Sequence, residues 1–85
     1  RTLCTVATTS NGINVRSRPD PNSFRVSQAS FGTIMDVLQQ EVGTDNRRWF
    51  RVEFMVDEIP VSGWIRSDYV QPIGGTVCPA IRSSQ

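Results

Sequence analysis

The stretch Gly63-Trp64-Ile65-Arg66-Ser67-Asp68-Tyr69-Val70 decides the fold of this chain, together with Ile13-Asn14-Val15-Arg16-Ser17-Arg18-Pro19 near its start. In the earlier stretch Ile13 and Val15 alternate with polar residues, which is the period of a strand with one buried face. The later stretch reads as a short strand followed by Ser67-Asp68, whose side chains bond to nearby backbone and favour a tight turn. The two stretches therefore predict strands that bracket one small β domain.

Short strand-like segments also fill the rest of the chain, and turn-forming Gly, Pro and Asn residues separate them. We expect strands at 3–8, 13–18, 26–30, 33–42, 47–56, 63–66 and 70–73, with turns at 11–12, 43–46 and 57–62. No segment has a convincing helical period. Such a succession predicts a single all-β domain, either a small barrel or a sandwich.

A third stretch, Arg48-Trp49-Phe50-Arg51-Val52, lies between the first two. In this order the three stretches resemble the bacterial SH3 family, whose sequences have a hydrophobe-Asn-Val-Arg-Ser start, a central Trp-aromatic-basic-Val strand and a closing Gly-Trp-hydrophobe-x-Ser-x-Tyr-hydrophobe. The resemblance covers about residues 12–73. It implies an SH3-like barrel of five to seven short antiparallel strands at 1–75. A terminal segment at 76–85 would follow, with a loose tail at 81–85.

The chain departs from the family pattern in the segment that follows the first of these strands. Arg18 stands where the family usually has glycine, which alone enters positive φ freely. Ser27 and Ser30 occupy positions where the family places Ile and Leu, and the segment 26–32 is about one residue shorter than usual. Ligand contacts that relatives make with this loop therefore do not carry over.

Two cysteines, Cys4 and Cys78, lie near the two ends of the expected barrel. Because terminal strands lie side by side in SH3-like folds, the resemblance implies that the two cysteines form a disulfide. In the chain-entropy model, a bridge that encloses nearly the whole domain stabilises the folded state by about 4 to 5 kcal/mol. Since disulfides persist in oxidising compartments, we expect a secreted protein or one of the cell envelope. Two unrelated buried thiols are the alternative.

Several function classes are disfavoured by composition. Two distant cysteines without any histidine do not make a zinc site, and neither a metal nor a cofactor is expected. Nine arginines and eight acids are spread along a chain of net charge +1, which gives no footprint for nucleic acid. No apolar run is long enough for membrane insertion. Without histidine or an activation motif we expect no enzyme, but a monomeric module of a larger chain.

An aromatic surface is the sharpest functional prediction from the strands. Alternation within 47–56 places Trp49 with the charged residues rather than with the core, and the same pattern places Trp64 and Arg66 on the polar face of the adjacent strand. With Tyr69 these residues would form one outward surface, and contiguous exposed aromatics usually mark a recognition site. The alternative is that the tryptophans only stack across strands and bind no ligand.

The resemblance also suggests how such a surface would be used. In SH3 domains that bind proline-rich peptides, residues at the positions of Trp49 and Tyr69 line the groove, and a proline stands where this chain has Arg66. Phe24 is the only aromatic residue in the loop after the first of these strands, so a polyproline groove would be incomplete. A different ligand is therefore expected.

Bacterial SH3 modules of exported proteins are thought to bind peptidoglycan peptides or crossbridges, and the resemblance implies that ligand class here. The loop 18–24 would join the aromatic surface, with Arg18, Arg66 and Asn22 meeting peptide amides and carboxylates. Two other functions stay open. One is a protein interaction domain for an extended or proline-containing peptide, and the other is a structural spacer in a surface protein.

Overall fold

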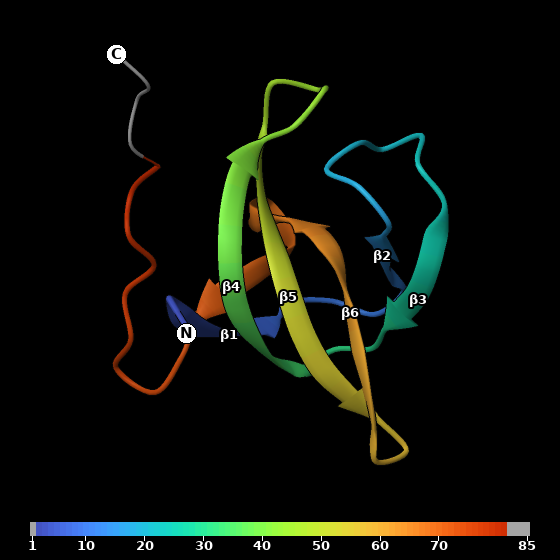
Figure 1. Ribbon diagram of the computed structural model, residues 1–85. Coiled ribbons are helices and arrows are strands. Elements are labelled where there is room, and N and C mark those ends of the chain that lie inside the picture. Colours follow the sequence, from blue (N-terminus) through green and yellow to red (C-terminus); the bar gives the residue numbers. More distant parts are fainter. Residues whose placement is uncertain (1, 82–85) are drawn as a thin grey trace.

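The computed structural model describes residues 2–81, which form seven strands and one short 3-10 turn (Figure 1). The elements in chain order are β1 (Cys4–Thr8), β2 (Ile13–Arg16), β3 (Arg25–Ala29), β4 (Ile34–Val42), β5 (Arg48–Val56), β6 (Ile59–Arg66), η1 (Ser67–Tyr69) and β7 (Val70–Pro72). All pairs are antiparallel in one sheet of order β3-β2-β6-β5-β4-β1-β7, which confirms the predicted all-β fold. Of the predicted tail at 81–85, all but Ile81 lies outside the described residues.

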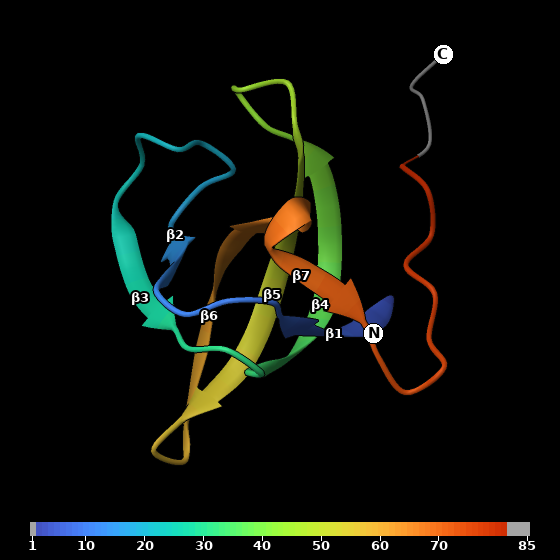
Figure 2. The same cartoon turned by 180° about the vertical axis from the view of Figure 1, so that it is seen from behind.

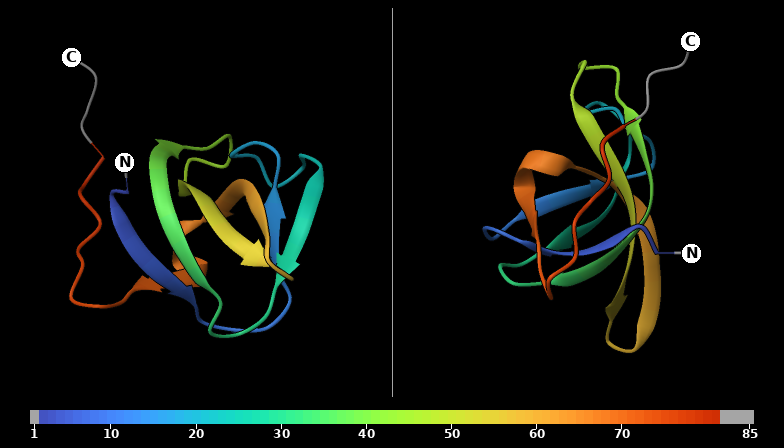
Figure 3. Two further views of the ribbon diagram at one scale, coloured as in Figure 1. Left: turned by 60° about the horizontal axis from the view of Figure 1, so that its bottom comes forward. Right: turned by 90° about the vertical axis from the view of Figure 1, so that its left-hand side faces the viewer.

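The sheet curls around one hydrophobic core (Figure 3). Ala29 of β3 and Val70 of β7 come from the two end strands of the sheet, yet both belong to the same buried cluster. Alternate residues of the intervening strands supply the fully buried side chains, among them Val6, Val15, Met35, Val37, Val52 and Ile65. The period-2 pattern in the sequence therefore predicted the inward face of β2, β5 and β6.

The β5–β6 hairpin is tighter than predicted. Val56 pairs with Ile59, so the connection is only Asp57-Glu58, and the expected turn at 57–62 is wrong. Both turn residues have positive φ, 49° and 68°, as a two-residue type I′ turn requires. Pro60 does not end the strand, because here β6 pairs with β5 alone and few ladder bonds are lost.

Replacing Glu58 by glycine is expected to stabilise the domain. Glu58 holds a left-handed conformation that costs an L-residue roughly 1 to 2 kcal/mol, and glycine adopts it without that cost. After the greater entropy of glycine in the unfolded chain is subtracted, we expect a gain of about 0.5 to 1 kcal/mol in urea unfolding. Glu58→Ala removes the same charge but keeps the strain, so it should give no gain. An equal gain from both variants would attribute the effect to charge.

β1 and β7, the first and last strands along the chain, lie side by side (Figure 2). β1 pairs with β7 in the register Val6 to Pro72, and the Cα atoms of Cys4 and Cys78 are 5.0 Å apart across their disulfide. The predicted bridge is confirmed, and the alternative of two unrelated thiols is wrong. The bridge joins β1 to a segment that has already left the sheet.

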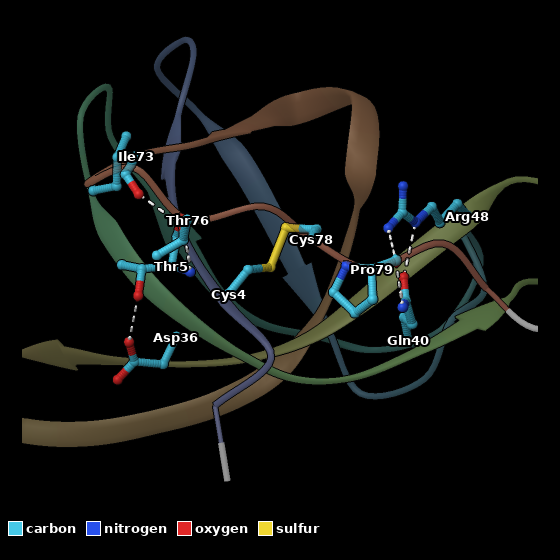
Figure 4. The surroundings of a disulfide bond; sticks show 9 residues. All are labelled: Cys4, Thr5, Asp36, Gln40, Arg48, Ile73, Thr76, Cys78 and Pro79. Carbon is cyan, nitrogen blue, oxygen red and sulfur yellow. Dashed lines mark hydrogen bonds between the residues drawn. A yellow bond between two sulfur atoms is a disulfide. The ribbon is translucent and has the colours of Figure 1, made fainter.

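Residues 76–81, which we call the strap, extend beyond the sheet and are bonded back to it on both sides of the disulfide (Figure 4). The Thr76 hydroxyl donates to the Thr5 carbonyl at 3.0 Å and accepts from the Thr5 N–H at 3.2 Å. Further along, the Pro79 carbonyl accepts from Arg48 Nη2 at 2.6 Å and from Gln40 Nε2 at 2.7 Å. The strap is therefore fixed to β1, β4 and β5.

Candidate functional site

A small pocket of about 190 Å³ lies where β2, the loop after it, β5 and the β6–η1 connection meet. Three of the predicted site residues line it: Trp49, Arg66 and Tyr69. The other lining residues are Gly12, Ile13, Asn14, Arg16 and Pro21. The pocket thus combines aromatic rings with polar side chains, and most of its lining comes from β2 and the segments on either side of it.

Trp49 is buried rather than exposed, with only 3% of its surface accessible, so its predicted exposure is wrong. The alternation of residues in β5 predicted the correct face of the strand, because Trp49 pairs with Arg66 and lies outside the main core. Two loops cover it. The Thr44 N–H donates to the Pro19 carbonyl at 3.1 Å, and a Cβ on Gly43 would meet the indole ring and that carbonyl at 2.5 Å. The missing side chain of Gly43 lets both loops close over the tryptophan.

Arg66 connects the buried indole to the rim of the pocket. The Trp49 indole N–H donates to Asp45 Oδ1 at 2.8 Å, and Asp45 Oδ2 is 3.5 Å from Arg66 Nη1. Arg66 Nε donates to Asp68 at 2.7 Å, and Nη2 donates to the Tyr69 hydroxyl at 2.8 Å. Its guanidinium carbon also lies 4.8 Å from the centre of the Tyr69 ring. The guanidinium of Arg66 is therefore already bonded to neighbouring side chains, and it holds Tyr69 in position.

Asp45 and Arg66 both keep their charges at neutral pH. Partial burial raises the pKa of Asp45, but hydrogen bonds from Trp49, from the backbone N–H groups of Arg47 and Asp45 and from Arg66 together bring that pKa below its ordinary value. The pKa of Arg66 is raised, chiefly by its hydrogen bond to Asp68. Two carboxylates thus neutralise Arg66, which leaves it poorly suited to capture an anionic ligand.

Arg16 is the second arginine of the pocket, and its surroundings differ from those of Arg66. Its Nη1 donates to the Ser23 carbonyl at 2.9 Å. Ser23 is itself buried, and its single O–H is shared between the carbonyls of Asp20 at 2.7 Å and Arg18 at 3.0 Å, which fixes the loop. Within residues 2–81, Arg16 has no ion-pair partner, and its Nε and Nη2 donate no hydrogen bond. One edge of this guanidinium is therefore unpaired.

The other polar side chains of the pocket also have donors to spare. Asn14 Oδ1 accepts from Gln28 Nε2 at 3.3 Å, which leaves the Asn14 amide N–H groups without a partner in the described chain. The Tyr69 oxygen accepts from Arg66, so its own O–H can donate elsewhere. No Asp or Glu of residues 2–81 lines the pocket. The pocket is thus suited to a ligand rich in hydrogen-bond acceptors.

The remaining predicted site residues do not line the pocket. Trp64 is half-buried and lies opposite Arg16 and Arg51 in the sheet, two pairs along the β5–β6 ladder from Trp49. Arg18, Asn22 and Phe24 are exposed on the loop between β2 and β3, and Phe24 is 74% accessible. The residues predicted to form one surface therefore lie in different places: three of them line the pocket, and the other four do not.

Sequence reasoning missed Asn14, Arg16 and Pro21 as site residues. A signal for two of them was present, because Asn14 and Arg16 alternate with the buried Ile13 and Val15 and so had to lie on the outer face. Their partnership with Tyr69 follows from the topology, which places β2 next to β6. That neighbour relation is not contained in any local pattern.

No group of three or more His, Cys, Asp or Glu side chains in residues 2–81 could hold a metal ion. No helix in the same range is long and apolar enough to cross a membrane.

Comparison with known proteins gives one match. Residues 11–71 match the family model of the bacterial SH3 domain, which is more than half of the chain. The chain belongs to the bacterial SH3 domain family. No curated protein and no solved structure matches it. Bacterial SH3 domains are generally binding modules, and this one is therefore a binding module in that general sense.

The region matched to the bacterial SH3 domain contains every residue that lines the pocket. β1, both cysteines and the strap lie outside it. The pocket therefore belongs to the part of the chain shared with the family, whereas the disulfide lies in the flanking segments.

Proposed function

We propose that this bacterial SH3 domain is a non-catalytic targeting module of an exported protein and that its pocket binds peptidoglycan peptides. The observation that carries the proposal is the combination of an aromatic wall with unpaired donors on Asn14, Arg16 and Tyr69. A peptide supplies carbonyl and carboxylate acceptors for these donors. Its small apolar side chains can contact Ile13, Pro21 and the Tyr69 ring.

Two further observations support this ligand and this location. The Trp49 indole N–H is donated to Asp45, and Arg66 stands at a position where proline-binding domains have a proline, so the pocket is poorly suited to a proline-rich peptide. The Cys4–Cys78 disulfide is compatible with an extracellular location, because such bonds persist in oxidising compartments. A peptide ligand of the cell wall agrees with both.

Cosedimentation of the purified domain with bacterial sacculi tests the proposal. We expect wild-type protein to sediment and Tyr69→Ala to bind about tenfold more weakly, because the variant loses both the aromatic wall and a donor. Phe24→Ala is the matched control, since it removes an exposed aromatic side chain outside the pocket and should bind like wild type. Circular dichroism must show that both variants are folded.

Two outcomes would contradict the proposal. Equal loss of binding in Tyr69→Ala and Phe24→Ala would move the site away from the pocket. Failure of the wild-type domain to bind sacculi with several types of crossbridge would exclude peptidoglycan and favour an extended peptide of a protein partner.

A further inference from the structure

We propose that Arg16 is the anchor of the pocket and captures the free C-terminal carboxylate of a peptide. This inference rests on the proposed function, and it narrows the ligand from a peptide in general to the end of a peptide chain. It assigns the ligand's negative charge to Arg16 rather than to Arg66, Arg18 or Asn22, which the sequence had favoured.

The distribution of charge distinguishes Arg16 from Arg66. Arg66 is 2.7 Å from Asp68 and 3.5 Å from Asp45, so its positive charge is already compensated. Arg16 has no carboxylate within 4.0 Å among residues 2–81. An incoming carboxylate would therefore meet an uncompensated guanidinium at Arg16 and would be repelled by the two acids beside Arg66.

The unpaired donors of Arg16 also have a suitable geometry. Nη1 of Arg16 donates to the Ser23 carbonyl, and the hydroxyl of the buried Ser23 in turn bonds to the carbonyls of Arg18 and Asp20. The guanidinium is thereby held in place before a ligand arrives. The remaining Nε and Nη2 form one edge of the planar group, and that edge can donate two parallel hydrogen bonds to a carboxylate. Little side-chain entropy is then lost on binding.

The size of the pocket favours the end of a peptide over a longer segment. Its volume of about 190 Å³ is smaller than the roughly 300 to 1,000 Å³ of typical ligand sites. Asn14 and Tyr69 can donate to the carbonyl groups that precede the terminal carboxylate. Ile13 and Pro21 would contact a small terminal side chain.

A carboxylate could also come from an aspartate or glutamate side chain, and the test must separate the two sources. Isothermal titration calorimetry with three probes does so. The probes are N-acetyl-alanyl-alanine, its C-terminal amide, and an N-acetylated, C-terminally amidated peptide with one internal glutamate. We expect the free acid to bind. Both amidated probes should bind at least about tenfold more weakly, because each lacks a charge-assisted hydrogen bond to Arg16.

Variants assign the effect to Arg16. Arg16→Gln should bind the free acid about tenfold more weakly and should no longer distinguish it from the amide. Arg18→Gln, an exposed arginine two residues away that does not line the pocket, should behave like wild type. Arg16→Lys keeps the charge without the planar edge and should recover only part of the affinity.

Each other result has a definite meaning. Equal affinity of wild type for acid and amide would overturn the inference, and so would tight binding of the internal glutamate probe. If sacculus binding still depended on Tyr69 in either case, the proposed function would survive. Arg16-dependent binding of the free acid without any binding to sacculi would do the reverse: the inference would stand and the peptidoglycan proposal would fall.

Discussion

Reduction of the Cys4–Cys78 disulfide is expected to remove about 4 to 5 kcal/mol of stability. The bond joins positions that are 74 residues apart, and in the chain-entropy model the stabilisation grows with the logarithm of the enclosed loop. Small domains typically have about 5 to 15 kcal/mol of net stability, so this loss is a large share of the total. Release of the strap would also weaken the hydrogen bonds at Thr76 and Pro79.

Urea unfolding of the oxidised and reduced wild type measures this effect. The double variant Cys4→Ser/Cys78→Ser should resemble reduced wild type, and addition of a dithiol to that variant should change nothing further. Mass spectrometry under non-reducing conditions establishes the state of the bond in each sample. Stabilities of oxidised and reduced protein within about 1 kcal/mol of each other would show that the sheet and strap hold without the bond.

Replacing Trp49 by alanine is expected to cost about 3 to 5 kcal/mol, as for a large aromatic residue in a packed interior. Trp49 is 3% exposed, and its ring fills the space between the Pro19 and Gly43 segments. Its removal would leave a cavity beneath two loops and would take away one of the two hydrogen bonds that Asp45 Oδ1 accepts, the other coming from the Arg47 N–H. The pocket should be damaged together with the fold, so this variant is a test of structure and not of binding.

Two variants separate packing from hydrogen bonding at this position. Trp49→Phe keeps most of the ring and loses the bond to Asp45, so a cost of about 1 to 2 kcal/mol is expected. Trp64→Ala removes the other tryptophan, which is only half-buried, and should cost less than Trp49→Ala. A cost below about 1 kcal/mol for Trp49→Ala would place this side chain on the surface and contradict its burial beneath the two loops.

Much of the fold could be predicted because the relevant signals are local. Alternation in β5 predicts that Phe50, Val52, Phe54 and Val56 share the inward face; the first three are buried, whereas Val56, next to the turn, is 40% exposed. The family resemblance supplied the neighbouring positions of the terminal strands and hence the disulfide. The turn predicted at 57–62 was too long, because Glu58 stands where a two-residue turn of this kind usually has a glycine.

The candidate site was harder to predict because it depends on contacts between distant segments. The sequence put Trp49 on the outer face but could not show that two loops cover it. Arg66 looked like a ligand-binding residue, and only the structure shows its bonds to Asp68 and Tyr69. Arg16 looked like an ordinary outward residue of a strand, yet its unpaired edge makes it the more suitable anion receptor.

The most direct test of peptide binding in the pocket is a titration of the isotope-labelled domain with soluble peptide fragments released from sacculi. The readout is the change in the NMR chemical shifts of backbone amides and side chains. We predict that shifts concentrate on Gly12, Asn14, Arg16 and Tyr69, with little change at Phe24 or in the β5–β6 hairpin. Shifts concentrated on the hairpin, on Phe24 or along the strap, or no shifts at all, would contradict the assignment of the pocket as a peptidoglycan-peptide site.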